Sequence, residues 1–382
     1  MTRTRHGRIV LEDRVAVGRL DFDQRIVALD AGAALDPHDP QHEALPWILP
    51  GFVDAHVHGG GGGDAMDGPD GVRTLAAAHL RHGTTTLLPT TLTAPWPDVT
   101  AALRGIAAVR AEADPALPDL PGAHLEGPFI SPDRLGAQPP HAQRPTPERL
   151  DELLALDVVR VATVAPEIPG ALDAVARLAR AGVRVSAGHT RADADTTDAF
   201  FAAIAAAGGT AGATHLFNAM GGLEGRAPGT AGAVLASTDA YAELICDGHH
   251  VARAAAMTAL RAKGRRLLLI TDAIRAAATD ARDTTLGGQP VRIEGGAARL
   301  ADGTLAGSVL TMDRAVATLI GFGATWPQAA YAAATAPARY LGLDDRGALR
   351  PGLRADLVVL DPDGTVREVL RAGRTVAGDP TG

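Results

Sequence analysis

The feature that most constrains the fold is an alternation of short apolar runs with longer helical segments, from about residue 51 onward. Eight runs have strand length, and they occupy residues 51–58, 84–90, 123–128, 158–166, 183–189, 213–218, 242–247 and 267–272. Apolar strands separated by helices are typical of parallel sheets that are covered on both faces. Eight such units over roughly 280 residues have the size of a (β/α)8 barrel, which needs about 250 residues.

Helix boundary signals between these runs support that interpretation. A helix over 70–82 is expected to end at Gly83, and another over 172–181 at Gly182, because glycine commonly follows a helix C-terminus. Thr146 and Pro147 have the residue types preferred at the N-cap and at the first helical position. A doubly wound open sheet is the alternative fold, but no glycine-rich dinucleotide turn follows any of the expected strands.

The two ends of the chain have a different pattern. Short apolar or alternating segments at 8–11, 14–17, 25–29, 355–360 and 366–370 have strand length. We therefore predict a small β-sandwich domain formed by residues 1–50 together with 345–382, beside a barrel domain of residues 51–344. Within the barrel domain, residues 284–307 are expected to form a hairpin insertion around Gly295 and Gly296.

Composition narrows the classes of function. The chain has 382 residues, a formal net charge of −8 and 3% aromatic residues, so it lacks the basic excess and the stacking groups of a nucleic-acid-binding protein. A single cysteine, Cys246, excludes an internal disulfide and suits a reducing compartment. Neither a signal peptide nor an apolar stretch of membrane-spanning length is present. We expect a cytoplasmic protein with no membrane or nucleic-acid partner.

Polar side chains gather where the expected strands end, which is the face that carries chemistry in such barrels. Six of them could bind a metal: His56, His58, Glu126, His189, His215 and Asp272. Each one alone has an ordinary structural explanation, such as a histidine paired with a carbonyl or an aspartate capping a helix. Six at one rim are difficult to explain independently. Imidazoles and carboxylates suit Zn²⁺ or Fe²⁺, so the pattern predicts a metal site.

Sequence motifs at these positions resemble a known family. Residues 51–59 (GFVDAHVHG) resemble the first motif of the amidohydrolase superfamily, and residues 346–360 are similar to its C-terminal signature. A narrower resemblance, to the N-acetylglucosamine-6-phosphate deacetylases, covers about residues 51–361. It is carried by HLEGPFISP at 124–132, GHT at 188–190, THLFNAM at 214–220, CDGHH at 246–250, TDA at 271–273 and LAGS at 305–308.

The resemblance implies how the metal is held. Glu126 would bind one ion with His189 and His215, in the place of the carbamylated lysine of other amidohydrolases, and Lys263, the one lysine, lies away from the strand ends. His56 and His58 would bind a second ion. One or two divalent ions per subunit are therefore expected, zinc first, with iron, manganese or cobalt as alternatives.

The resemblance also implies the reaction. A metal-bound water with lowered pKa would attack the acetamide carbonyl as hydroxide, and Asp272 would take the water proton and deliver it to the leaving amine. The substrate would be N-acetylglucosamine-6-phosphate, and the products glucosamine-6-phosphate and acetate. The reaction is hydrolysis of a linear amide, and the resemblance implies a role in amino-sugar catabolism or cell-wall recycling.

Substrate-binding residues follow from the same motifs. The family binds its amino-sugar phosphate with residues that correspond to Asn218, Ala219, His250 and Arg226. Family members are usually homodimers in which the arginine reaches the neighbour's phosphate. A solvated loop charge is the simpler interpretation of Arg226. His249 is the alternative to His250, because adjacent strand residues face opposite ways.

One position departs from the family pattern. Gln138 stands where the family commonly has a histidine that contacts the substrate, and His141 follows three residues later. Gln138 leaves open a related amidohydrolase acting on N-acetylgalactosamine-6-phosphate, on a non-phosphorylated N-acetyl sugar or on an N-acyl amino acid. A non-catalytic metal-binding barrel is a further alternative, which Asp272 opposes because a closed structural site needs no free base.

Overall fold

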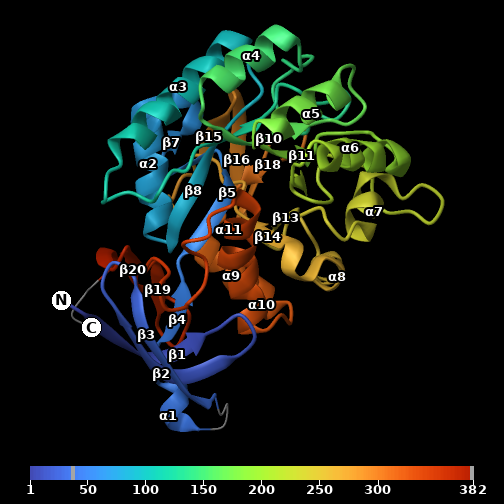
Figure 1. Cartoon of the computed structure of the whole chain (residues 1–382). Coiled ribbons are helices and arrows are strands. Elements are labelled where there is room, and N and C mark those ends of the chain that lie inside the picture. Colours follow the sequence, from blue (N-terminus) through green and yellow to red (C-terminus); the bar gives the residue numbers. More distant parts are fainter. Residues whose placement is uncertain (36–38, 379–382) are drawn as a thin grey trace.

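The computed structural model describes residues 1–35 and 39–378 of the chain. A barrel of strands enclosed by helices occupies the upper part of Figure 1, and strands from both ends of the chain lie together below it. His38, a histidine of the N-terminal segment, lies outside the described residues.

Eight parallel strands form the barrel. They are β5 (Phe52–Val57), β8 (Thr84–Thr91), β9 (Ala123–Glu126), β10 (Val159–Val164), β11 (Arg184–Ala187), β12 (Ala211–Ala213), β13 (Ala242–Ile245) and β14 (Leu267–Ile270). Six are continuously paired in the order β12-β11-β10-β9-β8-β5, and β13 pairs with β14. Backbone hydrogen bonds join the two parts at both junctions, among them Leu216 N to Glu243 O at 2.8 Å and Asp272 N to His56 O at 2.9 Å. The predicted barrel fold is confirmed.

The sixth strand differs from the prediction. A strand was expected over 213–218, whereas β12 ends at Ala213 and the following residues form a turn. His215 and Phe217 have φ of +31° and +80°, a left-handed conformation that a strand cannot contain. Ala213 and Leu216 are fully buried and Phe217 partly so, which is why this segment has the composition of a strand.

Helices cover the outside of the barrel. They are α2 (Pro69–Leu80), α3 (Trp96–Glu112), α4 (Pro147–Ala155), α5 (Ala171–Arg180), α6 (Ala194–Ala206), α7 (Gly229–Ala236), α8 (Arg253–Lys263), α9 (Met312–Gly321), α10 (Trp326–Ala330) and α11 (Ala336–Leu341), with a π-helical turn at Tyr331–Thr335 and 3₁₀ turns at Ala65–Asp67 and Gly264–Arg266. The expected boundaries are confirmed: the Thr146 hydroxyl accepts a hydrogen bond from Arg149 N, and Gly83 and Gly182 have positive φ. Every residue of β5, β8, β9, β13 and β14 is buried, as expected for strands covered on both faces.

Both ends of the chain contribute to one sheet. Its strands are β1 (Arg3–Val10), β2 (Val15–Phe22), β3 (Ile26–Ala34), β4 (Trp47–Pro50), β19 (Leu357–Leu360), β20 (Val366–Arg371) and β21 (Arg374–Gly378). Their order is β21-β20-β19-β4-β1-β2-β3, with the short helix α1 (Pro40–Glu43) between β3 and β4. The β sheet formed by both termini is confirmed; its sandwich packing and the division at residues 50 and 345 stay predictions.

A four-stranded antiparallel insertion lies at the carboxyl end of the barrel. It contains β15 (Asp283–Leu286), β16 (Gln289–Glu294), β17 (Ala297–Arg299) and β18 (Leu305–Ser308). The turn between β16 and β17 has positive φ at Gly295 and Gly296, so the predicted hairpin is confirmed. Ser308 N donates to Asp272 O at 2.8 Å, which attaches β18 to the chain just after β14. A smaller hairpin of β6 (Gly59–Gly60) and β7 (Gly63–Asp64) follows β5.

Candidate active site

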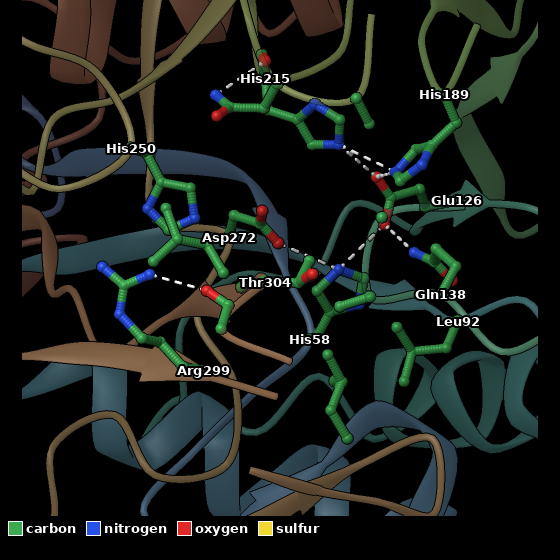
Figure 2. A pocket seen from close by; sticks show the side chains of 18 residues that line it. His58, Leu92, Glu126, Gln138, His189, His215, His250, Asp272, Arg299 and Thr304 are labelled. Carbon is green, nitrogen blue, oxygen red and sulfur yellow. Dashed lines mark hydrogen bonds and ion pairs between the residues drawn. The ribbon is translucent and has the colours of Figure 1, made fainter. Parts of the chain in front are cut away.

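The six residues expected at the barrel rim come together in the structure. His56 lies within β5 and His58 directly after it, and Glu126 is the last residue of β9. The other three follow strand ends: His189 after β11, His215 after β12 and Asp272 after β14. All six are buried, and five of them are labelled around one cavity in Figure 2. Parallel packing of the strands therefore brings residues 216 positions apart in the sequence to a single centre.

Glu126 lies between two pairs of histidines. Its Oε1 is 3.1 Å from His189 Nε2 and 2.9 Å from His215 Nε2. Its Oε2 is 3.0 Å from His58 Nε2 and 3.5 Å from His56 Nε2. Each oxygen of one carboxylate thus faces its own imidazole pair, an arrangement in which the carboxylate could contribute to two neighbouring metal sites.

Three of the imidazoles are oriented by acceptor groups on the side away from the centre. Nδ1 of His58 faces the Thr90 carbonyl at 3.2 Å, and Nδ1 of His189 faces the Arg134 carbonyl at 2.9 Å. Nδ1 of His56 faces Glu243 Oε2 at 3.0 Å. Because these oxygens accept hydrogen bonds, Nδ1 carries the proton and Nε2 is left to face the centre. Such outer partners are the usual companions of metal-binding histidines.

The donor set fits divalent metal ions. The ligand atoms of His56, His58 and Glu126 lie within 4.8 Å of one another, and so do those of Glu126, His189 and His215. Within each pair the two Nε2 atoms are 3.2 Å and 3.0 Å apart, so two lone-pair atoms converge on one point. Imidazole and carboxylate donors in this number suit zinc and similar ions with room for further ligands.

The charges of the centre reinforce one another. Burial would raise the pKa of Glu126, but the neighbouring imidazoles, His56 foremost, hold it well below its usual range. Burial opposes protonation of His58, yet its hydrogen bonds to Asp272 and Glu126 raise its pKa to about 9. The carboxylates therefore favour positive charge on the imidazoles, and the same field favours a cation that replaces those protons.

Asp272 is the carboxylate at the open side of this centre. Its Oδ1 is 3.1 Å from His58 Nε2 and 3.5 Å from His56 Nε2. Burial raises the pKa of Asp272, but the charges of the two histidines outweigh burial and keep this pKa below its usual value. Asp272 is thus ionised at neutral pH and can accept a proton beside the histidine pair.

Three of the six residues have an unusual backbone. His189, His215 and Asp272 have φ of +47°, +31° and +48°, in the left-handed region that side chains with a Cβ seldom adopt. Each one lies two residues beyond the end of a barrel strand and turns its side chain toward the centre (Figure 2). Backbone strain of this kind costs about 1–3 kcal/mol per residue and concentrates at functional sites.

A cavity of about 410 Å³ opens onto the centre. The residues around it come from the barrel rim, from the loops that follow β9, β12 and β13, and from the insertion. They are His58, Leu92, Glu126, Gly136, Ala137, Gln138, His189, His215, Asn218, Ala219, His250, Asp272, Leu286, Arg299, Gly303, Thr304, Leu305 and Gly307. Asn218, Ala219, His250 and Gln138, all expected to bind substrate, are therefore brought to one pocket.

The choice between the two adjacent histidines is now clear. His250 lines the cavity, whereas His249 is exposed and is not among the lining residues. Nδ1 of His250 donates to Asp247 Oδ2 at 2.7 Å, and the backbone N–H of His250 donates to Asp247 Oδ1 at 2.8 Å. Asp247 thus fixes the ring of His250 through Nδ1, and this hydrogen bond does not involve Nε2.

Gln138 has an unexpected role. Its Oε1 accepts the backbone N–H of Thr93 at 2.7 Å, so its Nε2 must donate to Glu126 Oε2, 2.6 Å away. The amide therefore supports the Glu126 carboxylate as well as lining the cavity. His141 does not compensate for the missing histidine, because it lines a separate hollow beside Asp64 and Arg275.

Arg226 lies outside the cavity of its own chain. It is exposed on the loop before α7, in a surface hollow that Arg134 and Arg191 also line. This position neither supports nor opposes a role in a neighbouring subunit's site, and that role stays a prediction.

Two kinds of residue at the site were not identified from the sequence: residues of the insertion and a buried carboxylate behind the centre. Arg299 and Thr304 come from the insertion, and their positions depend on how the hairpin packs against the rim. Glu243 lies inside a buried strand beside His56, and the signal for it is an acidic residue within the apolar run 242–245.

Comparisons with known proteins agree with this geometry. Residues 47–376 match the model of the amidohydrolase family. The chain is 39% identical to the N-acetylgalactosamine-6-phosphate deacetylase of Escherichia coli O157:H7, with 98% of this chain and 99% of that protein covered. It is 36% identical to the N-acetylglucosamine-6-phosphate deacetylase of Bacillus subtilis, with 83% and 81% covered.

Solved structures are similar over their whole length. A variant N-acetyl-D-glucosamine-6-phosphate deacetylase from Mycobacterium smegmatis, in complex with N-acetyl-D-glucosamine-6-phosphate, superposes with a TM-score of 0.89 at 36% identity, covering 99% of each chain. The enzyme from Thermotoga maritima gives a TM-score of 0.88 at 32% identity, covering 99% of this chain and 100% of the other. No helix in the described ranges is long and apolar enough to cross a membrane.

Proposed function

Because the chain belongs to the amidohydrolase superfamily and, within it, to the N-acetylhexosamine-6-phosphate deacetylases, we propose that it hydrolyses the acetamide of N-acetylglucosamine-6-phosphate. The products are glucosamine-6-phosphate and acetate. The observation that carries this proposal is Glu126 between two imidazole pairs, with Asp272 beside them at the wall of a sugar-sized cavity.

Glu126, His189 and His215 would hold one divalent ion, and His56 and His58 would hold a second with the other oxygen of Glu126. Zinc is the proposed ion. A bound ion of this kind lowers the pKa of water and polarises a carbonyl oxygen. The chain's own part is to aim these donors, and it does so through the hydrogen bonds behind His56, His58 and His189.

Asp272 acts as the general base and acid. Its pKa is kept low, so its carboxylate is ready to take a proton from the attacking water at neutral pH. The same carboxylate then delivers that proton to the amine nitrogen, because an amine leaves poorly unless it is protonated. The Asp272 carbonyl accepts the Ser308 N–H at 2.8 Å, which fixes this segment against the insertion.

The rest of the cavity binds the sugar phosphate. His250, Asn218, Ala219 and Gln138 contact the substrate in this proposal. Of the described residues that line the cavity, Arg299 alone carries a guanidinium, the group best suited to phosphate. We also propose a homodimer in which Arg226 reaches the phosphate held in the neighbouring subunit. A subunit-exchange experiment with Arg226→Ala and Asp272→Asn chains tests this, since mixed dimers would then contain one site with both groups intact.

N-acetylgalactosamine-6-phosphate is the second candidate substrate. Its support is the E. coli O157:H7 relative, which has that activity in its name and covers the whole chain. The two sugars differ only in the orientation of one hydroxyl group, so a direct comparison is required.

The test is release of acetate from both phosphorylated sugars and from plain N-acetylglucosamine, each with and without chelator. We expect turnover of a phosphorylated sugar, loss of that turnover with chelator, and little turnover of the plain sugar. Preference for the galactosamine compound would select the second candidate. Turnover of the plain sugar alone, or of none of the three, would contradict the proposal.

A further inference from the structure

Glu243 is a buried carboxylate that reaches the metal centre from behind. It lies on β13, is 1% exposed and is not among the residues that line the cavity. It can therefore act on the reaction only through other residues.

One oxygen of Glu243 contacts both halves of the centre. Glu243 Oε2 is 3.0 Å from Nδ1 of His56, and it accepts the backbone N–H of His215 at 3.2 Å. The main chain adds to this link, because the Glu243 carbonyl accepts the N–H of Leu216 at 2.8 Å. His56 belongs to one imidazole pair and His215 to the other, so Glu243 connects the two.

The contact fixes the direction of His56. A carboxylate at Nδ1 keeps the proton on that nitrogen, and Nε2 then faces His58 Nε2 at 3.2 Å and Glu126 Oε2 at 3.5 Å. On another side the ring of His124 packs edge-on against His56, with centroids 4.5 Å apart. His56 is thus held by one strong acceptor and by ring contacts, of which the one with His124 has the shortest centroid distance.

The contact with His215 holds a strained turn. His215 has φ of +31°, and its Nδ1 has no partner among the described residues, unlike Nδ1 of the other three histidines. Its backbone N–H is therefore an important anchor, and Glu243 receives it.

A purely structural explanation of Glu243 is weak. Its second oxygen, Oε1, is buried and has no partner within the described ranges. Burying a carboxylate with an unsatisfied oxygen costs free energy, and an apolar side chain in the same strand would avoid that cost. A carboxylate at this depth is favourable beside groups that donate hydrogen bonds or bind a cation, and Nδ1 of His56 faces it at 3.0 Å.

We propose that Glu243 is a positioning residue that sets the affinity of the ion held by His56, His58 and Glu126. Through the turn at His215 it also acts, more weakly, on the ion held by His189 and His215. This inference rests on the metal centre of the proposed function, but it is separable from the reaction.

Two substitutions test it. Glu243→Met keeps the volume and removes the acceptor, whereas Glu243→Gln keeps an acceptor oxygen without the charge. Glu368→Met is the matched control, because Glu368 is also buried on a strand but pairs with Arg3 and Arg5 in the terminal sheet. Each metal-free protein is titrated with Zn²⁺ in competition with a chromophoric chelator, and Co²⁺ absorption spectra report the coordination.

We expect Glu243→Met to bind one of the two ions about 10- to 100-fold more weakly, as losses of outer partners usually do. Glu243→Gln should recover part of this, with a loss below about tenfold, because one neutral hydrogen bond to His56 remains. Glu368→Met should keep both affinities, whatever its effect on unfolding. If Glu243→Met does not fold, a loss of about three- to tenfold in Glu243→Gln alone supports the proposal.

Metal affinities within twofold of the parent chain in the folded Glu243 variants would overturn the proposal, and so would an equal loss in Glu368→Met. Failure of the parent chain itself to bind zinc would instead contradict the proposed function. The two failures are therefore distinguishable.

Discussion

The two ends of the barrel both carry charged groups, but the groups are matched in different ways. At the amino end, Asp119 accepts hydrogen bonds from Arg346 and from Arg354, whose Nη1 is 2.9 Å away. Arg354 also pairs with Asp356, and Arg346 with Asp345 at 2.7 Å. Each charge there has an opposite charge beside it.

At the carboxyl end, like groups face each other. Nε2 of His189 and Nε2 of His215 are 3.0 Å apart, and those of His56 and His58 are 3.2 Å apart. His189, His215 and the neighbouring Asp272 also have a left-handed backbone. Two nitrogen atoms that face each other at this distance cannot both keep a lone pair there at low cost, and a divalent cation would relieve the arrangement.

The difference teaches how to separate a scaffold from a site in this fold. Charged groups that are paired with opposite charges of the same chain join the barrel to the C-terminal segment, to which Arg346, Arg354 and Asp356 belong. Charges that need an outside partner mark the place where metal and substrate bind. These charges lie at the carboxyl ends of the strands, in agreement with the general rule for the chemistry of such barrels.

The largest effect should come from Asp272→Asn. The amide cannot take a proton from water, so kcat should fall by about 10²- to 10⁴-fold, as expected for loss of a general base. The fold and the metal content should stay as in the parent chain, since Asp272 is not one of the three-residue donor groups. Acetate release and metal analysis measure both quantities. A rate close to that of the parent chain would remove Asp272 from its proposed role.

A smaller loss is expected from Arg299→Ala. Hydrogen bonds to charged groups contribute about 1.5–3 kcal/mol, so KM for the phosphorylated sugar should rise by ~10- to 100-fold with little change in kcat. Arg292→Ala is the matched control, because Arg292 pairs with Arg299 in register but does not line the cavity. Steady-state kinetics on both variants provide the comparison. An equal KM in the two variants would show that Arg299 does not contact the phosphate.

Asp119→Asn should change stability and leave the reaction alone. Burial raises the pKa of Asp119, but Arg346 and Arg354 outweigh it and lower this pKa to about 2. The ionised form is therefore favoured in the folded chain, and its stabilisation is present above the ordinary pKa and lost as pH falls toward 2. At pH 7 the substitution should lower the free energy of unfolding by about 1–2 kcal/mol. The ion pairs of Asp119 are partly exposed, so the loss is expected to lie between that of an exposed pair and that of a buried pair.

Denaturant unfolding at pH 7 and at pH 3 measures this effect. Asp151→Asn is the control, since Asp151 forms an exposed ion pair with Arg177 and should matter by less than about 0.5 kcal/mol. A fall in kcat/KM for fully folded Asp119→Asn protein would contradict the claim that the amino end of the barrel serves stability and the carboxyl end the reaction.

The smallest effect is expected from Gln138→His. Imidazole also offers one acceptor and one donor, but its ring holds them at different angles from the amide of Gln138, so we expect the bonds to Thr93 and Glu126 to weaken by ~1 kcal/mol in total, or about fivefold in kcat/KM. Gln143→His, outside the cavity, should have no effect. A gain in activity on the phosphorylated sugar would mean that Gln138 limits binding of that substrate.

The barrel was predictable from the sequence because its strands are apolar on both faces. The same periodicity places strand ends at one rim, so His56, His58, Glu126, His189, His215 and Asp272 could be grouped before any coordinates were known. The error at 213–218 has a related cause: the turn at His215 is buried, and burial alone gives a turn the composition of a strand.

Other parts of the site were not predictable because they depend on packing between distant segments. Arg299 reaches the cavity because the insertion is attached to the barrel rim, in part through the bond from Ser308 N to Asp272 O. Gln138 could be identified as a departure from the family, but its bond to Glu126 needed the loop geometry. The roles of Arg226 and of a second subunit are properties of an assembly and stay predictions.

The most direct test of the account is to remove metal from the protein, return Zn²⁺ in measured steps and follow acetate release from N-acetylglucosamine-6-phosphate and N-acetylgalactosamine-6-phosphate. The account predicts no turnover in the metal-free chain and a rise that saturates when one or two ions per chain are bound. Undiminished turnover without metal, or full metal binding with no acetate from either sugar, would contradict it.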